Sequence, residues 1–246
     1  MAKSNWTPEI SSPFVRLWGI EELIPRVSGW TDTDIQAWCD ELVEFIPTIA
    51  RPIDFPAASP TTLLPKDQDP STVTFRMRHA DLATPDILED APIGLVNLVA
   101  NYSGIVAVGA YDMSAMLCGP GIRPRPLSDG NYRRVEAFVT NPANGETSDW
   151  HVDERLTLPL YIQPGQALLV SHLTNARTVD DILESPFTLV EPAVGQFIAF
   201  DGVRHPHKGL AHKDFTGDRI AVGVLYDLPG VGVDGPQLDD LIAYTN

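Results

Sequence analysis

The chain is poor in cysteine and in long apolar runs. Its two cysteines, Cys39 and Cys118, lie far apart with no second cysteine near either. The sequence therefore encodes neither a disulfide framework nor a zinc–thiolate site, and we expect a reducing, cytoplasmic compartment. No apolar run approaches the roughly 18–20 residues that span a bilayer, and the first residues lack the apolar core of a signal peptide. We therefore expect neither a membrane anchor nor export.

Positive charge is also scarce. Lysine and arginine number 17 against 33 aspartates and glutamates, which gives a formal net charge of -16. Phosphate backbones would repel such a chain unless its basic residues formed a cluster, and the sequence has no such cluster. Nucleic acid is thus excluded as an expected partner. A small-molecule substrate is not, because one or two arginines set the field inside a cleft. The sequence does not indicate an oligomeric state.

The chain length and composition indicate one domain. The 246 residues are 43% hydrophobic, which suffices for a sizeable core, and no repeat or linker divides them. We expect a single domain over residues 1–246. In it, a helical and irregular N-terminal region over 1–103 packs on a catalytic core formed by 104–246.

Helical spacing is confined to the N-terminal region. Apolar residues recur at this spacing from Thr31 to Ile46, with Asp and Thr as caps before them and Pro47 after them, which predicts an amphipathic helix that ends at the proline. Residues 48–70 hold five prolines and are expected to be extended or irregular. A further helix is expected to begin near Pro92.

From about Gly104 onward the chain consists of short apolar runs of strand length, separated by Gly, Pro, Asn and Asp. Amphipathic helices do not alternate with these runs, so a sandwich or jelly roll is favoured over a parallel sheet. The predicted fold class is therefore mainly β, with N-terminal helices before an all-β core. The runs are IVAVGAYDM, RRVEAFVT, DWHVDE, LTLPLYI, QALLVSHL, FTLVEP, GQFIAF and RIAVGVLYD.

One of these expected strands carries His151-Val152-Asp153. Side chains two residues apart in a strand point to the same face, so an imidazole and a carboxylate are placed side by side. These are two of the three ligands of the facial triad that binds Fe(II) and leaves positions open for a co-substrate and O2. The third ligand must be a histidine from another strand. The alternative reading is an ordinary strand histidine that is hydrogen-bonded to Asp153.

Residues 195–227 supply the rest of a pattern. They hold an apolar strand that ends in FDG, a pair of histidines shortly after it, and Arg219 at the start of another apolar strand. With the HxD before them, these features resemble the Fe(II)/2-oxoglutarate-dependent oxygenases over roughly residues 132–227. The resemblance implies a double-stranded β-helix core, which is a jelly-roll relative of the cupins.

Two histidines compete for the third ligand position. Members of this family often place the ligand seven residues after the aromatic residue of the FDG-like segment, which is Phe200 here, so the resemblance implies His207. His205 is the alternative, because Pro206 cannot donate to a strand ladder and a local bulge can bring in either histidine. The implied metal ligands and catalytic residues are His151, Asp153 and His207.

The same resemblance implies that Arg219 binds the far carboxylate of 2-oxoglutarate, and a guanidinium suits this task because it forms bidentate pairs with carboxylates. The chain departs from the family at Ala221, where many members have a serine or threonine that donates to the same carboxylate. An alternative reading makes Arg219 a surface residue that pairs with Asp218 or Asp214. The candidates for the missing donor are Thr157, Tyr161 and Thr188.

The resemblance thus implies a dioxygenase that uses Fe(II), 2-oxoglutarate and O2. Related halogenases have a small residue in place of Asp153, so its presence favours hydroxylation of a C–H bond, while desaturation or cyclisation depends on substrate placement. The expected substrate is a small polar metabolite, such as an amino acid or a biosynthetic intermediate. Two other readings stay open: a cupin-like metalloenzyme without 2-oxoglutarate, which needs His172 at the metal, and a non-catalytic jelly-roll binding module. His79 and His212 are expected to lie outside the site.

Overall fold

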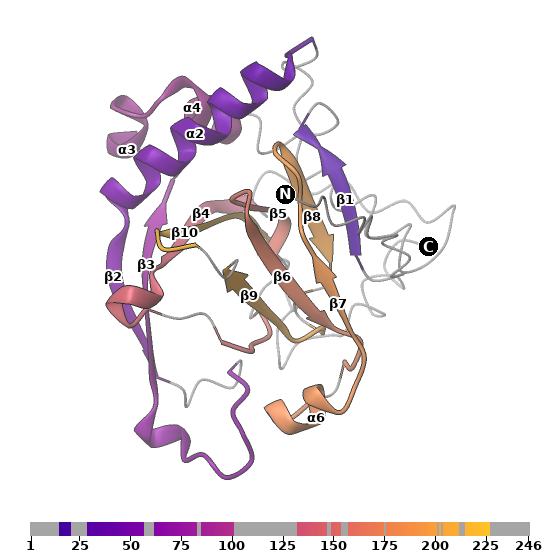
Figure 1. Ribbon diagram of the computed structural model, residues 1–246. Coiled ribbons are helices and arrows are strands. Elements are labelled where there is room, and N and C mark those ends of the chain that lie inside the picture. The colour runs from indigo at the N-terminus through magenta and orange to yellow at the C-terminus, as the bar shows by residue number, and fades with distance from the viewer. Residues whose placement is uncertain are drawn as a thin grey trace.

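The computed structural model describes residues 15–20, 29–56, 62–82, 85–100, 132–146, 149–153, 157–174, 176–200, 202, 204–211 and 215–226. Within these ranges the strands form one seven-stranded and one three-stranded sheet (Figure 1). The expected strand IVAVGAYDM and the expected boundary between residues 103 and 104 lie outside the described residues. None of the described helices is long and apolar enough to cross a membrane.

The larger sheet is antiparallel, in the order β1-β8-β5-β10-β4-β3-β2. The smaller sheet is also antiparallel, in the order β7-β6-β9. The strands of the larger sheet are β1 (Val15–Gly19), β2 (Arg51–Pro56), β3 (Thr74–Asp81), β4 (Tyr132–Thr140), β5 (Thr157–Ile162), β8 (Gln196–Phe200) and β10 (Arg219–Tyr226). Those of the smaller sheet are β6 (Gln166–Ser171), β7 (Phe187–Val190) and β9 (His207–Ala211).

From β4 onward the chain passes back and forth between the two sheets. β4 lies in the larger sheet, and His151 then joins the smaller one through a bridge to His207 at the start of β9. β5 returns to the larger sheet, β6 and β7 lie in the smaller one, and β8, β9 and β10 alternate between the two. This strand order is a double-stranded β-helix, in which two facing sheets enclose one interior. The predicted fold class, mainly β with a jelly-roll core and N-terminal helices, is confirmed.

The predicted amphipathic helix is α2 (Asp32–Ile49). A capping box between Thr31 and Asp34 fixes its start. Its predicted end is wrong, because Pro47 lies inside the helix rather than after it. A proline so close to the C-terminus removes one intrahelical N–H bond, and the last turn still closes through the Ala50 N–H, which donates to the Ile46 carbonyl at 3.1 Å. Buried residues on one face are Trp38, Cys39, Leu42 and Ile46.

The proline-rich stretch is more regular than predicted. Its residues 51–56 form β2, the edge strand of the larger sheet. Strand β2 pairs with β3 on one side. Proline is tolerated on an edge strand because its missing N–H can face away from the ladder. The helix predicted near Pro92 is α4 (Ile93–Ala100), preceded by α3 (Pro85–Glu89). Short 3-10 turns η2 (Pro70–Thr72) and η3 (Pro142–Asn144) join other elements.

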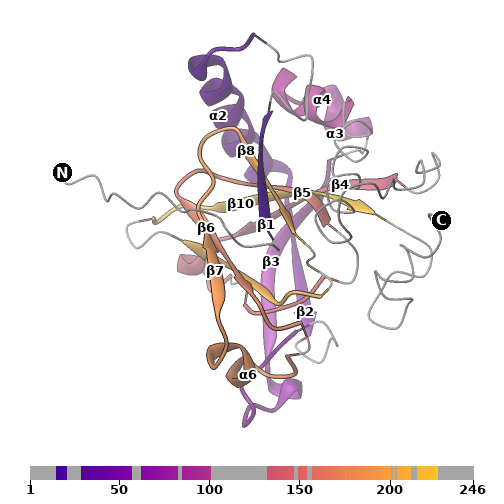
Figure 2. The same cartoon turned by 90° about the vertical axis from the view of Figure 1, so that its right-hand side faces the viewer.

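Two apolar clusters define which way the strands face. Helices α2, α3 and α4 gather at one end of the molecule, and α6 (Val179–Leu183) lies at the opposite end (Figures 1 and 2). Ile220 and Val222 of β10 pack with residues of α2, on the outer face of the larger sheet. Ala221 instead packs against a cluster that includes Ile162 of β5 and Val170 of β6, between the two sheets. Because side chains alternate along a strand, Arg219 shares the inward face of β10 with Ala221.

Candidate metal centre

His151, Asp153 and His207 come together at one place. One potential ligand atom from each lies within 4.8 Å of those of the other two. Backbone pairing holds them there: the His151 N–H donates to the His207 carbonyl at 3.1 Å, and the His207 N–H donates back at 2.8 Å. The Asp153 N–H donates to the Gly202 carbonyl at 2.8 Å. The chain therefore brings two segments of distant sequence into direct contact at the predicted triad.

Both imidazole rings are oriented by backbone carbonyls. Nδ1 of His151 lies 2.7 Å from the Asp149 carbonyl oxygen, and Nδ1 of His207 lies 3.0 Å from that of His205. A carbonyl oxygen only accepts, so each Nδ1 carries the proton in the neutral ring and each Nε2 keeps a free lone pair. Such outer contacts are typical of metal-binding histidines. Nε2 of His207 is 3.5 Å from Oδ1 of Asp153.

The charge states in this cluster suit a cation. Burial lowers the pKa of His151 to about 4, and the nearby His207 adds to this shift, so the His151 ring is neutral at pH 7. Burial also acts to lower the pKa of His207, but the Asp153 carboxylate outweighs it and the pKa is raised. A metal ion at this place would take over the role of that proton, because metal and proton compete for the same lone pair.

The donor set fits Fe(II). Two imidazole nitrogens and one carboxylate oxygen are the 2-His-1-carboxylate triad of non-haem Fe(II) sites. Ligand atoms that each lie about 2.1 Å from one ion are at most about 4.2 Å apart. Since the three atoms already lie within 4.8 Å of one another, side-chain movements of about an ångström or less would close the site.

The backbone of Gly202 passes close to this cluster. A Cβ atom at this position would collide with Oδ2 of Asp153 and would lie 3.2 Å from Cε1 of His207. Only glycine therefore leaves both side chains in place. The glycine of the FDG segment thus has a steric role that the sequence pattern alone does not explain.

The other histidines have different partners. His205 is buried, and its Nδ1 lies 2.8 Å from the Ser171 carbonyl oxygen. Nε2 of His172 lies 2.8 Å from the Thr188 hydroxyl, and Nε2 of His79 lies 3.1 Å from a carboxylate oxygen of Glu136. In the described part of the chain, none of the three joins the ligand cluster. The arrangement therefore favours His207 over His205, and it does not meet the requirement of the cupin-like reading for His172.

Arg219 projects into the interior from the start of β10. Its Nε donates to Oε1 of Gln166 on β6 at 2.9 Å, so the pair joins the two sheets. Burial lowers the pKa of Arg219, which remains charged at pH 7. Across the described ranges, no carboxylate lies within 4.0 Å of its guanidinium. Arg219 is thus a half-buried cation that has no counter-ion within the described ranges.

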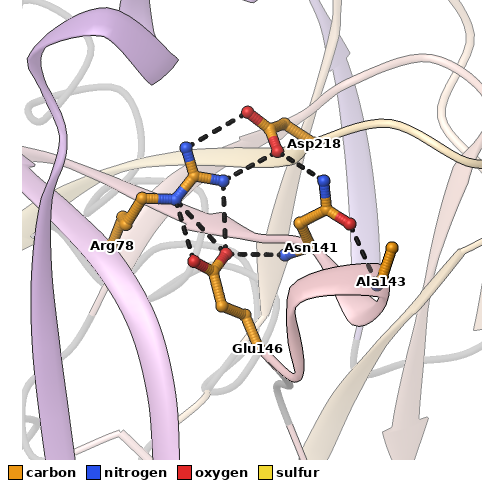
Figure 3. A network of polar contacts seen from close by, with 5 residues as sticks. All are labelled: Arg78, Asn141, Ala143, Glu146 and Asp218. Carbon is orange, nitrogen blue, oxygen red and sulfur yellow. Dashed lines mark hydrogen bonds and ion pairs between the residues drawn. The ribbon is translucent and has the colours of Figure 1, made fainter.

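The alternative pairing of Arg219 with Asp218 is wrong, because Asp218 is bound by Arg78 (Figure 3). Nη2 of Arg78 donates to Oδ1 of Asp218 at 2.7 Å, and Nε of Arg78 donates to Glu146 at 3.1 Å. Asn141 donates its side-chain N–H to Asp218 at 2.9 Å and its backbone N–H to Glu146 at 2.8 Å. This network ties the entry of β10 to β3 and to the turn after β4. The other suggested partner, Asp214, lies outside the described residues.

The guanidinium of Arg219 and the metal ligand His207 both lie at strand β9. A Cβ atom on Gly209 would collide with Nη2 of Arg219, so the guanidinium lies against the backbone of Gly209. Gly209 is two residues after His207 and faces the same way, and the α-carbons of these two residues are roughly 7 Å apart along the strand. A short dicarboxylate that chelates a metal at His207 can reach a guanidinium beside Gly209 with its other end.

The predicted second donors to the far carboxylate of 2-oxoglutarate were Thr157, Tyr161 and Thr188. Tyr161 faces outward and packs against Trp38 of α2, with ring centroids 5.7 Å apart, so the prediction for Tyr161 is wrong. The Thr188 hydroxyl is engaged by His172, and the side chain of Thr157 lies outside what the structure describes. Gln166, which contacts Arg219 directly, was not predicted. Nothing in its local sequence marks it, because its role depends on the approach of two strands from different sheets.

Comparisons with known proteins give only remote likenesses. No family model and no curated protein matches the chain. Among solved structures, it is similar to the non-haem alpha-ketoglutarate-dependent carbocyclase SnoK from nogalamycin biosynthesis, with 15% identity, 80% of this chain and 76% of that chain covered, and a TM-score of 0.42. It is also similar to the rice dioxygenase for auxin oxidation, with 14% identity, 85% and 74% covered, and a TM-score of 0.47. Likenesses at this level carry no argument, so function has to be argued from the site.

Proposed function

We propose that this chain is a non-haem oxygenase that depends on Fe(II) and 2-oxoglutarate. The observation that carries the proposal is the meeting of His151, Asp153 and His207, with both Nδ1 atoms held by backbone carbonyls, near an Arg219 that has no counter-ion among the described residues. A metal site alone would fit several enzyme classes. A half-buried guanidinium near it, with no counter-ion in the part of the chain that the structure describes, supports an anionic co-substrate that binds across both.

In this proposal the three side chains hold iron and Arg219 holds the far carboxylate of 2-oxoglutarate. The bound iron supplies activation of O2, with oxidation of 2-oxoglutarate to succinate and CO2 and insertion of the second oxygen atom into a substrate C–H bond. The protein holds the ligands and the co-substrate in register and limits access of water. The apolar cluster of Phe200, Val170 and Ile198 in the interior serves the last task.

Hydroxylation of a small polar metabolite, such as an amino acid or a biosynthetic intermediate, is the proposed reaction. Asp153 supports it, because a carboxylate there occupies the position that a halide needs in the related halogenases. No described feature favours a nucleic acid or a membrane as partner, and the buried, free thiol of Cys39 agrees with a reducing, cytoplasmic compartment.

Anaerobic calorimetric titration with Fe(II) or Mn(II) tests the metal site. The native chain is expected to bind one ion, and Asp153→Ala is expected to weaken binding at least about a hundredfold, or about 2.7 kcal/mol. Asp54→Ala is the control: its carboxylate is exposed on β2 and lies 3.7 Å from Arg76. It should bind metal like the native chain. Equal affinity of the native chain and Asp153→Ala would remove Asp153 from the site.

The same titration decides the third ligand. His207→Ala should lose the metal, whereas His205→Ala should retain it, and the reverse result would transfer the role to His205. Addition of 2-oxoglutarate to the Fe(II) form under nitrogen should produce a metal-to-ligand absorption band. Metal binding without this band would instead support the cupin-like alternative. With the band in hand, 2-oxoglutarate consumption against a panel of amino acids and related metabolites would identify the substrate class.

A further inference from the structure

Gln166 carries a buried donor that has no partner in the part of the chain that the structure describes. Its side chain is 4% exposed, and Nε2 has no hydrogen-bond partner among the residues that the structure describes. Its other amide atom, Oε1, accepts from Nε of Arg219 at 2.9 Å. Because Nε of arginine can only donate, this contact fixes which amide atom is the oxygen and leaves the NH2 group as the unpartnered end.

A buried donor without an acceptor is unfavourable and rare in native structures, so it points to a ligand that the ligand-free chain lacks. The neighbour of this donor is Arg219, a cation without a counter-ion in the described part of the chain. An anion bound by the guanidinium would place oxygens next to the amide. One bound carboxylate would therefore supply both the counter-ion for Arg219 and the acceptor for Nε2 of Gln166.

Resting on the proposed function, we infer that Gln166 is the second donor to the far carboxylate of 2-oxoglutarate, in place of the hydroxyl that Ala221 lacks. Ala221 faces the same interior as Arg219 but packs in an apolar cluster and offers no donor. Gln166 reaches the guanidinium from the opposite sheet, as the first residue of β6. A small turn of the amide about its last torsion, which is broad and shallow in glutamine, brings its N–H to the bound carboxylate.

Gln163 is the natural competitor, because it lies in the turn just before β6 and its N–H donates to the Ile220 carbonyl at 3.1 Å. Its unpartnered buried atom is Oε1, however, an acceptor that would repel a carboxylate. Gln163→Met is therefore a matched control for Gln166→Met. Both replacements are unbranched and of similar length, and both remove one amide.

The test is an anaerobic titration of the Fe(II)- or Mn(II)-loaded chain with 2-oxoglutarate, repeated with 2-oxobutanoate, which has the chelating end but no far carboxylate. Gln166→Met is expected to lower affinity for 2-oxoglutarate about tenfold, and to leave affinity for 2-oxobutanoate and for the metal unchanged. Gln163→Met should change none of the three. Adding Ala221→Ser to Gln166→Met should restore most of the lost affinity, because it puts a hydroxyl donor on the interior face of β10, two residues from Arg219.

Native affinity in Gln166→Met would overturn the inference, as would an equal loss for both 2-oxo acids, which would locate the effect away from the far carboxylate. A loss that appears with Gln163→Met alone would assign the donor to Gln163 instead. These failures differ from failure of the proposed function, in which the native metal-loaded chain itself would not bind 2-oxoglutarate. Thermal unfolding of each ligand-free variant separates a local effect from a misfolded protein.

Discussion

A methyl group at Gly209 should separate co-substrate binding from metal binding. The Cβ atom of Gly209→Ala would collide with Nη2 of Arg219. The backbone of β9 cannot yield easily, because it is paired with β6 along its length. The guanidinium has to move instead, by roughly an ångström, and His207, two residues earlier, stays in place.

The expected loss of 2-oxoglutarate affinity follows from the hydrogen bonds that Arg219 would donate to the far carboxylate. Charge-assisted hydrogen bonds contribute about 1.5–3 kcal/mol each. A displaced guanidinium would lose or weaken at least one such bond to the far carboxylate, so affinity for 2-oxoglutarate should fall at least about tenfold, or 1.4 kcal/mol. Overpacking costs typically 1–3 kcal/mol in a tight core, and the lower end applies here because the displaced group is the tip of a flexible side chain.

The assay is the same anaerobic titration, with metal affinity measured in parallel. Gly217→Ala is the control, because its Cβ would meet only carbon atoms of Phe215, at an ordinary 3.6 Å. A double-mutant cycle tests the cause: once Arg219→Ala has removed the guanidinium, Gly209→Ala should have little further effect on 2-oxoglutarate binding. A full additional loss in that background would refute the argument, since the methyl group would then act through something other than Arg219.

Three further outcomes are expected. Gly202→Ala, whose Cβ would collide with Oδ2 of Asp153, should weaken Mn(II) binding about 10–100-fold in calorimetry. Mn(II) at about 100 times its Kd should stabilise the native chain by about 2.7 kcal/mol in thermal unfolding, and should not stabilise Asp153→Ala. Arg78→Met removes the cation from two partly exposed carboxylates, which keep their hydrogen bonds from Asn141, and should cost about 1–2 kcal/mol in urea unfolding at pH 7. The hydrogen bonds from Arg78 lower the pKa of Asp218, so this contribution is present above about pH 4 and is lost as the pH falls through the lowered pKa. The stability difference between the native chain and Arg78→Met should therefore shrink on acidification.

Much of the fold could be predicted because it depends on local patterns. Helix α2 follows from apolar residues at helical spacing behind a Thr31 cap, and β4, β6, β8 and β10 follow from apolar runs between turn residues. Strand β9 was missed, since HKGLA has neither an apolar run nor an alternating pattern. It forms because its backbone pairs with β6 and because His207 forms a backbone bridge with His151. Strand β2 was missed for a related reason: its prolines argue against a central strand but not against an edge.

The candidate site likewise has one part that could be predicted from the sequence and one part that could not. The meeting of the HxD pair with His207 could be predicted, because the HxD spacing and the spacing from Phe200 are visible in the sequence, but the strand expected at DWHVDE is wrong, since His151 forms only isolated bridges. The surroundings of Arg219 could not be predicted. Arg219 does not pair with Asp218 because Asp218 is bound by Arg78, which lies 140 residues from Asp218 in sequence, and the contact of Arg219 with Gln166 spans 53 residues and two sheets. Pairings of that range leave no local pattern, so a sequence identifies the charged group but not what surrounds it.

Strand β9 links the two halves of the proposed site. His207 and Gly209 stand on one face of this strand with their α-carbons separated by the rise of two strand residues, roughly 7 Å, and the guanidinium of Arg219 lies against Gly209. Neither end can shift alone, because β9 is held by β6 on one side and by His151 on the other. A co-substrate that binds both ends must therefore match a fixed length. The double-stranded β-helix thus fixes the separation of the two binding groups, and the lack of a side chain at Gly209 allows the guanidinium of Arg219 to lie against β9.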